Sequence, residues 1–137
     1  MADGTLVDSN VLLDIMTEDP VWENWSTNAL ASAAEAGPVY INPIVYSEVS
    51  IRFSTVEALD AALPPQDYRR EAIPWPAAFL AGKVFLDYRR SGGTKVTTLP
   101  DFFIGAHAAI AGWDLLTRDV GRYRTYFPTV TLIAPDT

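Results

Sequence analysis

The sequence contains no cysteine and only one histidine, His107, among its 137 residues. Disulfide bonds and thiolate zinc sites are therefore excluded, as is any metal site that needs two histidines. No apolar run approaches the roughly 20 residues that a membrane-spanning helix requires. The first ten residues carry acids and no basic segment, which is unlike a signal peptide. These absences favour a cytoplasmic protein that does not bind a membrane.

Positive charge is absent from the first part of the chain. Residues 1–51 contain eight acids and no lysine or arginine, whereas residues 52–137 contain ten basic residues and nine acids. The whole net charge of −7 therefore comes from the first part. Phosphate repels a net negative protein, so RNA binding would require acids neutralised by metal and basic residues gathered on one face.

What is present is the composition of one folded domain, which we expect to span residues 1–137. Hydrophobic residues make up 49% of the chain and charged residues 20%, which argues against disorder. Short apolar strands are expected at residues 5–7, 39–41, 71–73, 114–117 and 130–133. Helices are expected at 9–16, 19–35, from Asn42-Pro43 past Val49, and at 55–63, 74–88 and 100–111, with a loop or short helix at 118–126. This alternation predicts an α/β fold with a parallel sheet covered on both faces. In the helix over 74–88, we expect Phe79, Val84, Phe85 and Tyr88 to be available to the core.

Four acids occupy positions where such a sheet binds ligands, at the carboxyl ends of its strands. Asp8 ends the first strand and Asp119 follows the strand at 114–117. Asp101 lies in the first turn of a helix, after a loop expected to emerge at the same edge, and Glu48 lies mid-helix. Each acid alone also has an ordinary interpretation, as a helix cap, a helix-dipole partner or a solvated side chain.

The apolar neighbours of three of these acids, Asp8, Glu48 and Asp101, favour a shared role for all four. Carboxylates among apolar residues need partners, and two of them about 4 Å apart repel by roughly 4 kcal/mol at an effective dielectric of 20. Protonation or a divalent cation would relieve that repulsion. An all-oxygen ligand set suits Mg²⁺ or Mn²⁺, which can activate water against a phosphodiester.

At these acids the chain resembles a known family, the PIN domains. The resemblance is carried in order by Leu6–Leu13, Ser47–Val49, Pro100–Ala108 and Leu116–Asp119. The ending from Arg122 to Val130 resembles the toxin members of that family, the VapC ribonucleases of VapBC toxin–antitoxin pairs.

The resemblance implies a three-layer α/β/α sandwich with a central, mainly parallel sheet, and a type II toxin that cleaves RNA with Mg²⁺ or Mn²⁺. It also implies a homodimer and inhibition by a VapB-like antitoxin. Asp8, Asp101 and Asp119 would hold the metal, and Glu48 would bind it or orient the attacking water. The residues implied to support the site are Ser9, Asn10 and Thr117, the last of which could steady Asp119. Gly121 and Arg122 stand where many relatives carry a further acid or polar residue, which makes a second metal less certain. Gly105 stands where the family often has alanine, a difference that we expect to matter little.

Several other polar residues can be interpreted in two ways. Arg118 and Arg122 could contact phosphate, or form salt bridges to the acidic first part. The basic loop over 89–95 could guide RNA or be merely solvated. His107 should point to a different side of its helix from Asp101, as a hydrogen-bonded rather than a catalytic histidine. The helix from Trp75 to Tyr88 could form a dimer or antitoxin surface.

Two other classes of protein compete with a ribonuclease. A catalytically silent binding partner on the same fold would not need four intact acids. An aspartyl phosphatase would need a second acid where Asn10 stands, and a receiver domain would need a late lysine, whereas none follows Lys95. The sequence therefore favours an endoribonuclease that acts on single-stranded or looped RNA.

Overall fold

A computed structural model describes residues 3–96 and 98–135 of the chain. The strands are β1 (Thr5–Val7), β2 (Val39–Ile41), β3 (Arg69–Arg70), β4 (Asp114–Leu116) and β5 (Leu132–Ile133). The helices are α1 (Ser9–Met16), α2 (Glu23–Ala36), α3 (Pro43–Ser50), α4 (Val56–Ala62), α5 (Trp75–Arg90), α6 (Pro100–Ala111) and α7 (Gly121–Tyr126). Among the described residues, no helix is both long and apolar enough to cross a bilayer.

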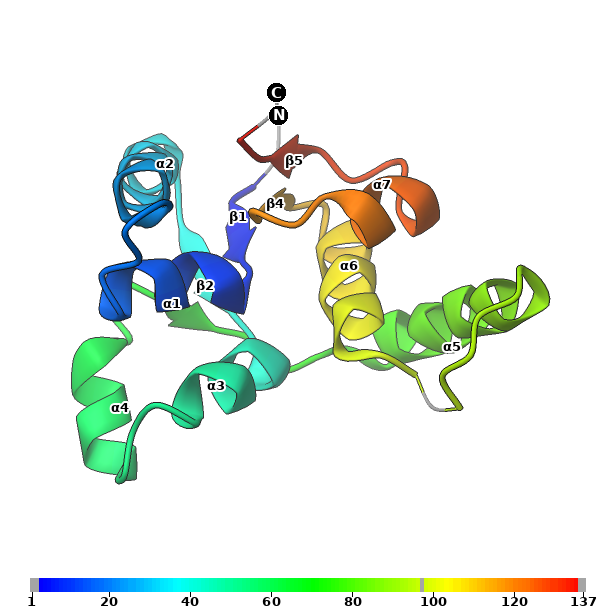
Figure 1. Ribbon diagram of the computed structural model, residues 1–137, viewed down its shortest axis with the longest axis horizontal. Helices are drawn as coiled ribbons and strands as arrows, with labels where there is room; N and C mark the ends of the chain where they lie inside the picture. Colours follow the sequence, from blue (N-terminus) through cyan, green and yellow to red (C-terminus); the bar gives the residue numbers. More distant parts are fainter. Residues whose placement is uncertain (1–2, 97, 136–137) are drawn as a thin grey trace.

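The five strands form one parallel sheet in the order β3-β2-β1-β4-β5. Central strand β1 is buried along its whole length, and its Leu6 is paired with Tyr40 on one side and Leu115 on the other. In the view of Figure 1, helices α1 to α4 lie to one side of β1 and helices α5 to α7 to the other. The predicted α/β fold with a central parallel sheet is confirmed.

Most helices begin and end close to the predicted residues, but α2 begins at Glu23 and not at the expected Asp19-Pro20, because the Asp19 carboxylate accepts from the Val21 and Trp22 amides in a turn that precedes the helix. Asp8 caps α1 by accepting a hydrogen bond from the Ser9 amide, and Asn42 caps α3 by accepting one from the Val45 amide. These caps satisfy amides that have no partner within their own helix. Gly112 ends α6 in the left-handed region at φ 73°, where glycine carries no steric penalty. Asp8 is therefore fixed at the junction of β1 and α1 by its capping role.

Two boundaries of the sheet differ from the sequence prediction. The expected strand at 71–73 is wrong, because β3 instead comprises Arg69 and Arg70, which pair with Tyr40 and Ile41. Both arginine side chains are exposed on this edge strand, where charged residues are tolerated. Strand β5 is shorter than expected, with only two residues, Leu132 and Ile133. Strand β3 lacks the apolar pattern from which a strand is predicted, whereas β5 has that pattern and is only shorter than expected.

Two side-chain expectations were also wrong. Phe79, which was expected to be available to the core, is 68% exposed on α5, whereas Val84 on the same helix is buried. Gly105 on α6 faces the ring of Phe127 so closely that an added Cβ would lie 2.4 Å from the Phe127 Cδ2 atom. The absence of a side chain at Gly105 therefore lets α6 pack against Phe127, and an alanine here would matter.

Candidate active site

The four predicted acids come from four different elements around the carboxyl end of the sheet. Asp8 follows β1, and its amide donates to the Leu116 carbonyl of neighbouring strand β4 at 2.9 Å. Asp119 lies three residues beyond the end of β4, Asp101 lies in the first turn of α6, and Glu48 lies on α3. Parallel pairing of β1 with β4 therefore brings Asp8 close to the loop that carries Asp119.

Asp8 is the buried centre of this group, with 4% of its surface exposed. Its Oδ1 atom accepts from the Ser9 amide at 2.8 Å, and its Oδ2 atom accepts from the hydroxyls of Thr117 at 2.9 Å and Tyr123 at 3.0 Å. A longer contact of 3.4 Å joins Oδ2 to the Asn10 amide. Burial raises the pKa of Asp8 to about 6, against the hydrogen bond from Thr117, and the charge of Asp101 adds to the rise. Hydrogen-bond donors therefore fix the Asp8 carboxylate, but its ionised form is still destabilised by burial.

Glu48 and Asp101 are half-buried and share this repulsion. Burial raises the pKa of Glu48, which accepts a hydrogen bond from the Ser9 hydroxyl at 2.9 Å, and the charge of Asp101 raises it further. Burial also raises the pKa of Asp101; the guanidinium of Arg122 opposes that rise, and the charge of Asp119 reinforces it. The four acids therefore interact through their charges.

Asp119 is exposed, and its main chain is fixed by Thr117. The Asp119 amide donates to the Thr117 hydroxyl oxygen at 3.1 Å. The same oxygen lies 2.9 Å from Asp8 and 3.3 Å from the Asn10 side-chain amide. Thr117 was expected to steady Asp119, and it contacts the main chain of that residue rather than its carboxylate. One hydroxyl thereby links the ends of β1 and β4.

The chemistry of the donor set fits a hard divalent cation. The group offers carboxylate oxygens and no sulfur, which Mg²⁺ and Mn²⁺ prefer. Within residues 3–96 and 98–135, no three acidic or histidine side chains are already grouped so as to hold a metal ion. Burial raises the pKa of Asp8, Glu48 and Asp101, and the charge of a neighbouring acid adds to each rise, so the negative charge of this group is only partly compensated. A divalent cation would supply the missing positive charge, so the residues fit the ion by their chemistry.

The two predicted arginines differ in their surroundings. The Arg118 guanidinium forks onto Asp14 with distances of 2.8 and 2.9 Å, and it lies over the Trp22 ring. Asp14 is buried on α1 and cannot reach solvent for another partner. Arg122 lies 3.5 Å from Asp101 and its side chain is 43% exposed. Of these two arginines, Arg122 therefore has exposed guanidinium donors beside the acids that could bind a phosphate. The guanidinium of Arg118 is occupied by its salt bridge to Asp14.

His107 lies in the core away from these roles, as predicted. It is 2% exposed, and its Nδ1 atom lies 3.2 Å from the Asn42 side-chain amide nitrogen. The Asn42 oxygen already accepts from the Val45 amide, so its nitrogen is the donor and His107 Nδ1 accepts. Burial lowers the pKa of His107, which keeps the ring neutral.

Tyr123 is the residue at the site that sequence reasoning missed. Its ring is buried at 1% exposure, and its hydroxyl contacts both Asp8 and Asp101. The spacing of Val120, Tyr123 and Phe127 is that of one helix face, which could have indicated a buried tyrosine four residues after Asp119.

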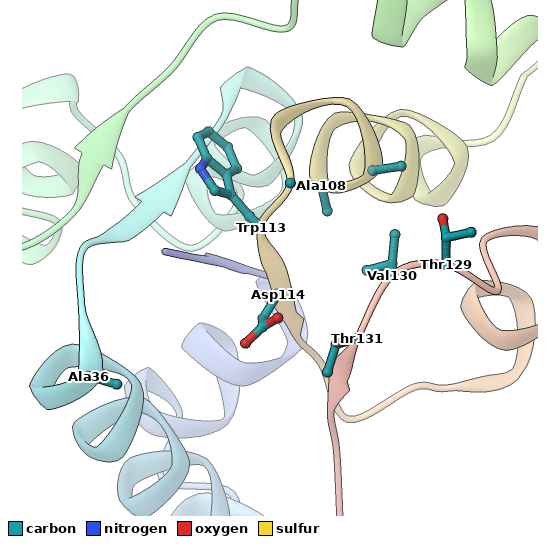
Figure 2. A pocket seen from close by; sticks show the side chains of 9 residues that line it. Ala36, Ala108, Trp113, Asp114, Thr129, Val130 and Thr131 are labelled. Atoms are coloured by element: carbon teal, nitrogen blue, oxygen red, sulfur yellow. The ribbon is translucent and has the colours of Figure 1, made fainter. Parts of the chain in front are cut away.

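The large hollow drawn in Figure 2 lies at the other end of β4 from these acids. It has a volume of about 530 Å³ and is lined by the end of α6, the start of β4 and the approach to β5. Asp114 is the only acid that lines it, and small side chains such as Ala36 and Ala108 make up much of the rest. The candidate site therefore lies with the four acids at the carboxyl edge of the sheet and not in this hollow.

A parallel α/β sheet with four acids at its carboxyl edge defines the class of protein. The chain belongs to the PIN domain family, whose model matches residues 5–128. Members of this family are in general nucleases that use divalent metal ions. The resemblance stated from the sequence is thus confirmed at the level of the family.

Solved structures of toxin–antitoxin complexes share this fold. A chain of VapBC2 from Rickettsia felis is 17% identical with a TM-score of 0.73, and the match covers 96% of this chain and 98% of that chain. A chain of VapBC-1 from nontypeable Haemophilus influenzae is 15% identical with a TM-score of 0.70, covering 95% and 96%. A chain of a toxin–antitoxin complex from Klebsiella pneumoniae is 22% identical with a TM-score of 0.66, covering 93% and 96%. No curated protein matches the chain significantly.

Proposed function

We propose that this chain is the toxin of a type II toxin–antitoxin pair and a Mg²⁺- or Mn²⁺-dependent endoribonuclease. The observation that carries the proposal is the electrostatic coupling of Asp8, Glu48 and Asp101 at the carboxyl edge of a PIN-family sheet. The likeness of the fold to chains of VapBC complexes supports the toxin part. We further propose that it acts in the cytoplasm, where its RNA substrate would be found.

In this proposal, each acid has a role that its position supports. Asp8, Asp101 and Asp119 hold the metal, and Glu48 holds it or orients the attacking water. When bound, the ion would polarise the phosphodiester and make that water a better nucleophile. Ser9 supports Glu48 through its hydroxyl, which donates to the Glu48 carboxylate at 2.9 Å.

Two further groups complete the proposed site. Asn10 and Thr117 support Asp8. The Asn10 side-chain amide lies 3.4 Å from the Asp8 Oδ2 atom, and the Thr117 hydroxyl donates to the same atom at 2.9 Å. Arg122 contacts an RNA phosphate, because its exposed guanidinium lies beside Asp101 and can leave that 3.5 Å contact. Arg118 was a second candidate for phosphate contact, but its fork on Asp14 supports a structural role instead.

Partners of the protein follow from the same comparisons and from one exposed surface. We propose a VapB-like antitoxin as a partner, since the similar structures are toxin–antitoxin complexes. Trp75 and Phe79 on α5 are 89% and 68% exposed, and Leu86 on the same helix is 40% exposed. Exposed aromatic residues in a row are typical of a protein interface, which supports a homodimer through α5.

The experiment that tests the proposed function is RNA cleavage by the Asp101→Asn variant. The amide keeps the shape of the side chain and removes its charge, so we expect the protein to fold and cleavage of single-stranded RNA with Mg²⁺ or Mn²⁺ to fall at least 100-fold, on the order of the loss of a catalytic group. Asp87→Asn on exposed α5 is the matched control and should cleave as the wild type does.

Two outcomes would contradict the proposal. Asp101→Asn protein that cleaves as fast as the wild type would show that the site is elsewhere. Wild-type protein that cleaves no RNA with either metal, yet binds an antitoxin, would favour the silent binding partner instead.

A further inference from the structure

We infer that the hydroxyl of Tyr123 positions Asp8 and Asp101 relative to each other, and so sets how strongly the site binds a divalent cation. The inference rests on the proposed function, because it assumes that these two acids are metal ligands. Tyr123 lies on α7, for which the sequence predicts a loop or short helix with Arg122 as a candidate phosphate contact and no role for Tyr123.

The Tyr123 hydroxyl contacts both acids. It lies 3.0 Å from the Asp8 Oδ2 atom and 3.5 Å from the Asp101 Oδ1 atom. A hydroxyl has one proton, so Tyr123 donates to the nearer Asp8 while its oxygen sits beside Asp101. Three elements therefore meet at one atom: the end of β1, the start of α6 and the middle of α7.

Packing of the buried Tyr123 ring does not by itself require a hydroxyl. At 1% exposure its ring fills core space that a phenylalanine ring would fill equally well. What the hydroxyl adds is a donor between two carboxylates that repel each other.

The consequence for metal binding follows from preorganisation. Removal of a residue that orients a metal ligand commonly lowers the affinity for the metal 10- to 100-fold. Without the hydroxyl, Asp8 would keep its contacts with Ser9, Asn10 and Thr117, but it would lose the one donor that also lies beside Asp101. Tyr123 is thus a positioning residue, which acts through the acids and does not itself bind the metal.

The test is a calorimetric titration of metal-free protein with Mn²⁺, comparing the wild type with Tyr123→Phe. We expect the Kd for Mn²⁺ to rise about 10-fold in the variant. We also expect the KM for RNA to be unchanged, and cleavage at low Mn²⁺ to recover when Mn²⁺ is raised to saturation. A purely structural role for Tyr123 would not produce this rescue by metal.

Tyr126→Phe is the matched control, because it removes a hydroxyl from the same helix. The Tyr126 ring packs against Phe102 and Tyr88, and within the described residues its hydroxyl makes no hydrogen bond. We expect its Kd for Mn²⁺ to equal that of the wild type. If Tyr123→Phe unfolds at the titration temperature, the wild type and both variants are titrated at a lower temperature at which circular dichroism shows all three to be folded.

The outcomes separate the inference from the proposed function. Equal Mn²⁺ affinity of the wild type and Tyr123→Phe would overturn the inference and leave the metal site standing. A wild-type protein that neither binds Mn²⁺ nor cleaves RNA would overturn both. A raised Kd that is confined to Tyr123→Phe would support the inference.

Discussion

Asp8 has more hydrogen-bond donors than any other acid at the site, and it is also the acid whose charge is most costly. Four groups donate to its two oxygens, yet burial still raises its pKa to about 6 from the ordinary value of 3.8. Asp119, by contrast, is exposed. The site therefore pairs a buried, fixed carboxylate with an accessible one, which is a suitable arrangement for binding an ion that arrives from solvent.

The first prediction concerns the pH dependence of stability that Asp8 causes in metal-free protein. Because its folded pKa is raised, the unfolded chain loses this proton first as pH rises from about 4 to about 6. The free energy of unfolding should fall by up to about 3 kcal/mol over this range and then level off. Urea denaturation with a chelator should show this fall in the wild type relative to Asp8→Asn. A stability difference that stays constant from pH 4 to pH 8 would contradict the burial of this charge.

At the residue scale, the sequence predicted the acids better than it predicted their supports. A carboxylate at a strand end or in a first helical turn is visible in a single sequence, so Asp8 and Asp101 could be selected. The contacts of Tyr123 depend on how α7 packs against α6 near the end of β1, which no local pattern records. Likewise, nothing near Asp14 in sequence indicates that Arg118 would reach it across the fold.

At the scale of elements, a salt bridge fixes the loop that carries Asp119. Arg118 follows β4 and forks onto Asp14 of α1, and Asp14 also accepts from the Ser26 hydroxyl of α2 at 2.8 Å. Three elements are thus joined immediately beside Asp119. Asp14 has 3% of its side chain exposed, so removal of Arg118 would leave a buried charge without its counter-ion.

The second prediction follows from that burial. Arg118→Met should lower the free energy of unfolding by about 2 kcal/mol, less than for a fully buried pair because the Arg118 side chain is 31% exposed. Arg70→Met is the control, since it breaks a pair with Asp60 whose side chains are 38% and 40% exposed, and it should cost below about 1 kcal/mol. Denaturant unfolding of both variants measures the difference. Equal losses would mean that the Arg118 pair is no stronger than one at the surface.

The third prediction uses two helical glycines with opposite surroundings. Gly105→Ala on α6 would place a Cβ 2.4 Å from the Phe127 ring, so we expect destabilisation of about 1–3 kcal/mol despite the better helix propensity of alanine. Gly82→Ala on α5 meets nothing within 4 Å and should stabilise by up to about 1 kcal/mol. Melting temperatures of the pair should therefore move in opposite directions. A stabilised Gly105→Ala variant would contradict the close packing of α6 on Phe127.

Elements with strong boundary signals were predictable from the sequence, whereas the short edge strand β3 was not. The start of α3 follows an asparagine cap and a proline, and α6 ends at a left-handed glycine, so both were placed correctly. Strand β3 contains only two exposed arginines, and its pairing with β2 comes from the fold rather than from its own residues. Local propensity cannot indicate a strand that tertiary contacts create.

At the scale of the whole molecule, the uneven charge of the sequence is only partly neutralised by pairing. Of the three ion pairs within the described residues, only Arg118 with Asp14 joins the basic later part to the acidic first part. The first part therefore keeps most of its negative charge for a bound cation or a basic partner. The sequence predicted this asymmetry, but not which residues would pair.

The fourth prediction concerns the proposed homodimer through α5. Phe79→Glu removes an aromatic ring from the exposed row formed with Trp75 and Leu86 and places a charge there, so it should convert a dimer into a monomer because burying a charge in an apolar interface is costly. Light scattering coupled to size exclusion measures the mass. Val56→Glu on α4, where the side chain is 60% exposed, is the control and should remain a dimer. A Phe79→Glu variant that stays dimeric would place the interface elsewhere.

The most direct test of the account is anomalous diffraction from crystals of this protein grown with Mn²⁺. We predict an anomalous peak bound by carboxylate oxygens of Asp8 and Asp101, at roughly the 2.0–2.2 Å typical of oxygen ligands to small divalent ions. Glu48 and Asp119 should lie close enough to contact the ion directly or through water. Crystals in which Mn²⁺ is absent from these acids, while Arg122 remains on Asp101, would contradict the claim that the four carboxylates share one cation.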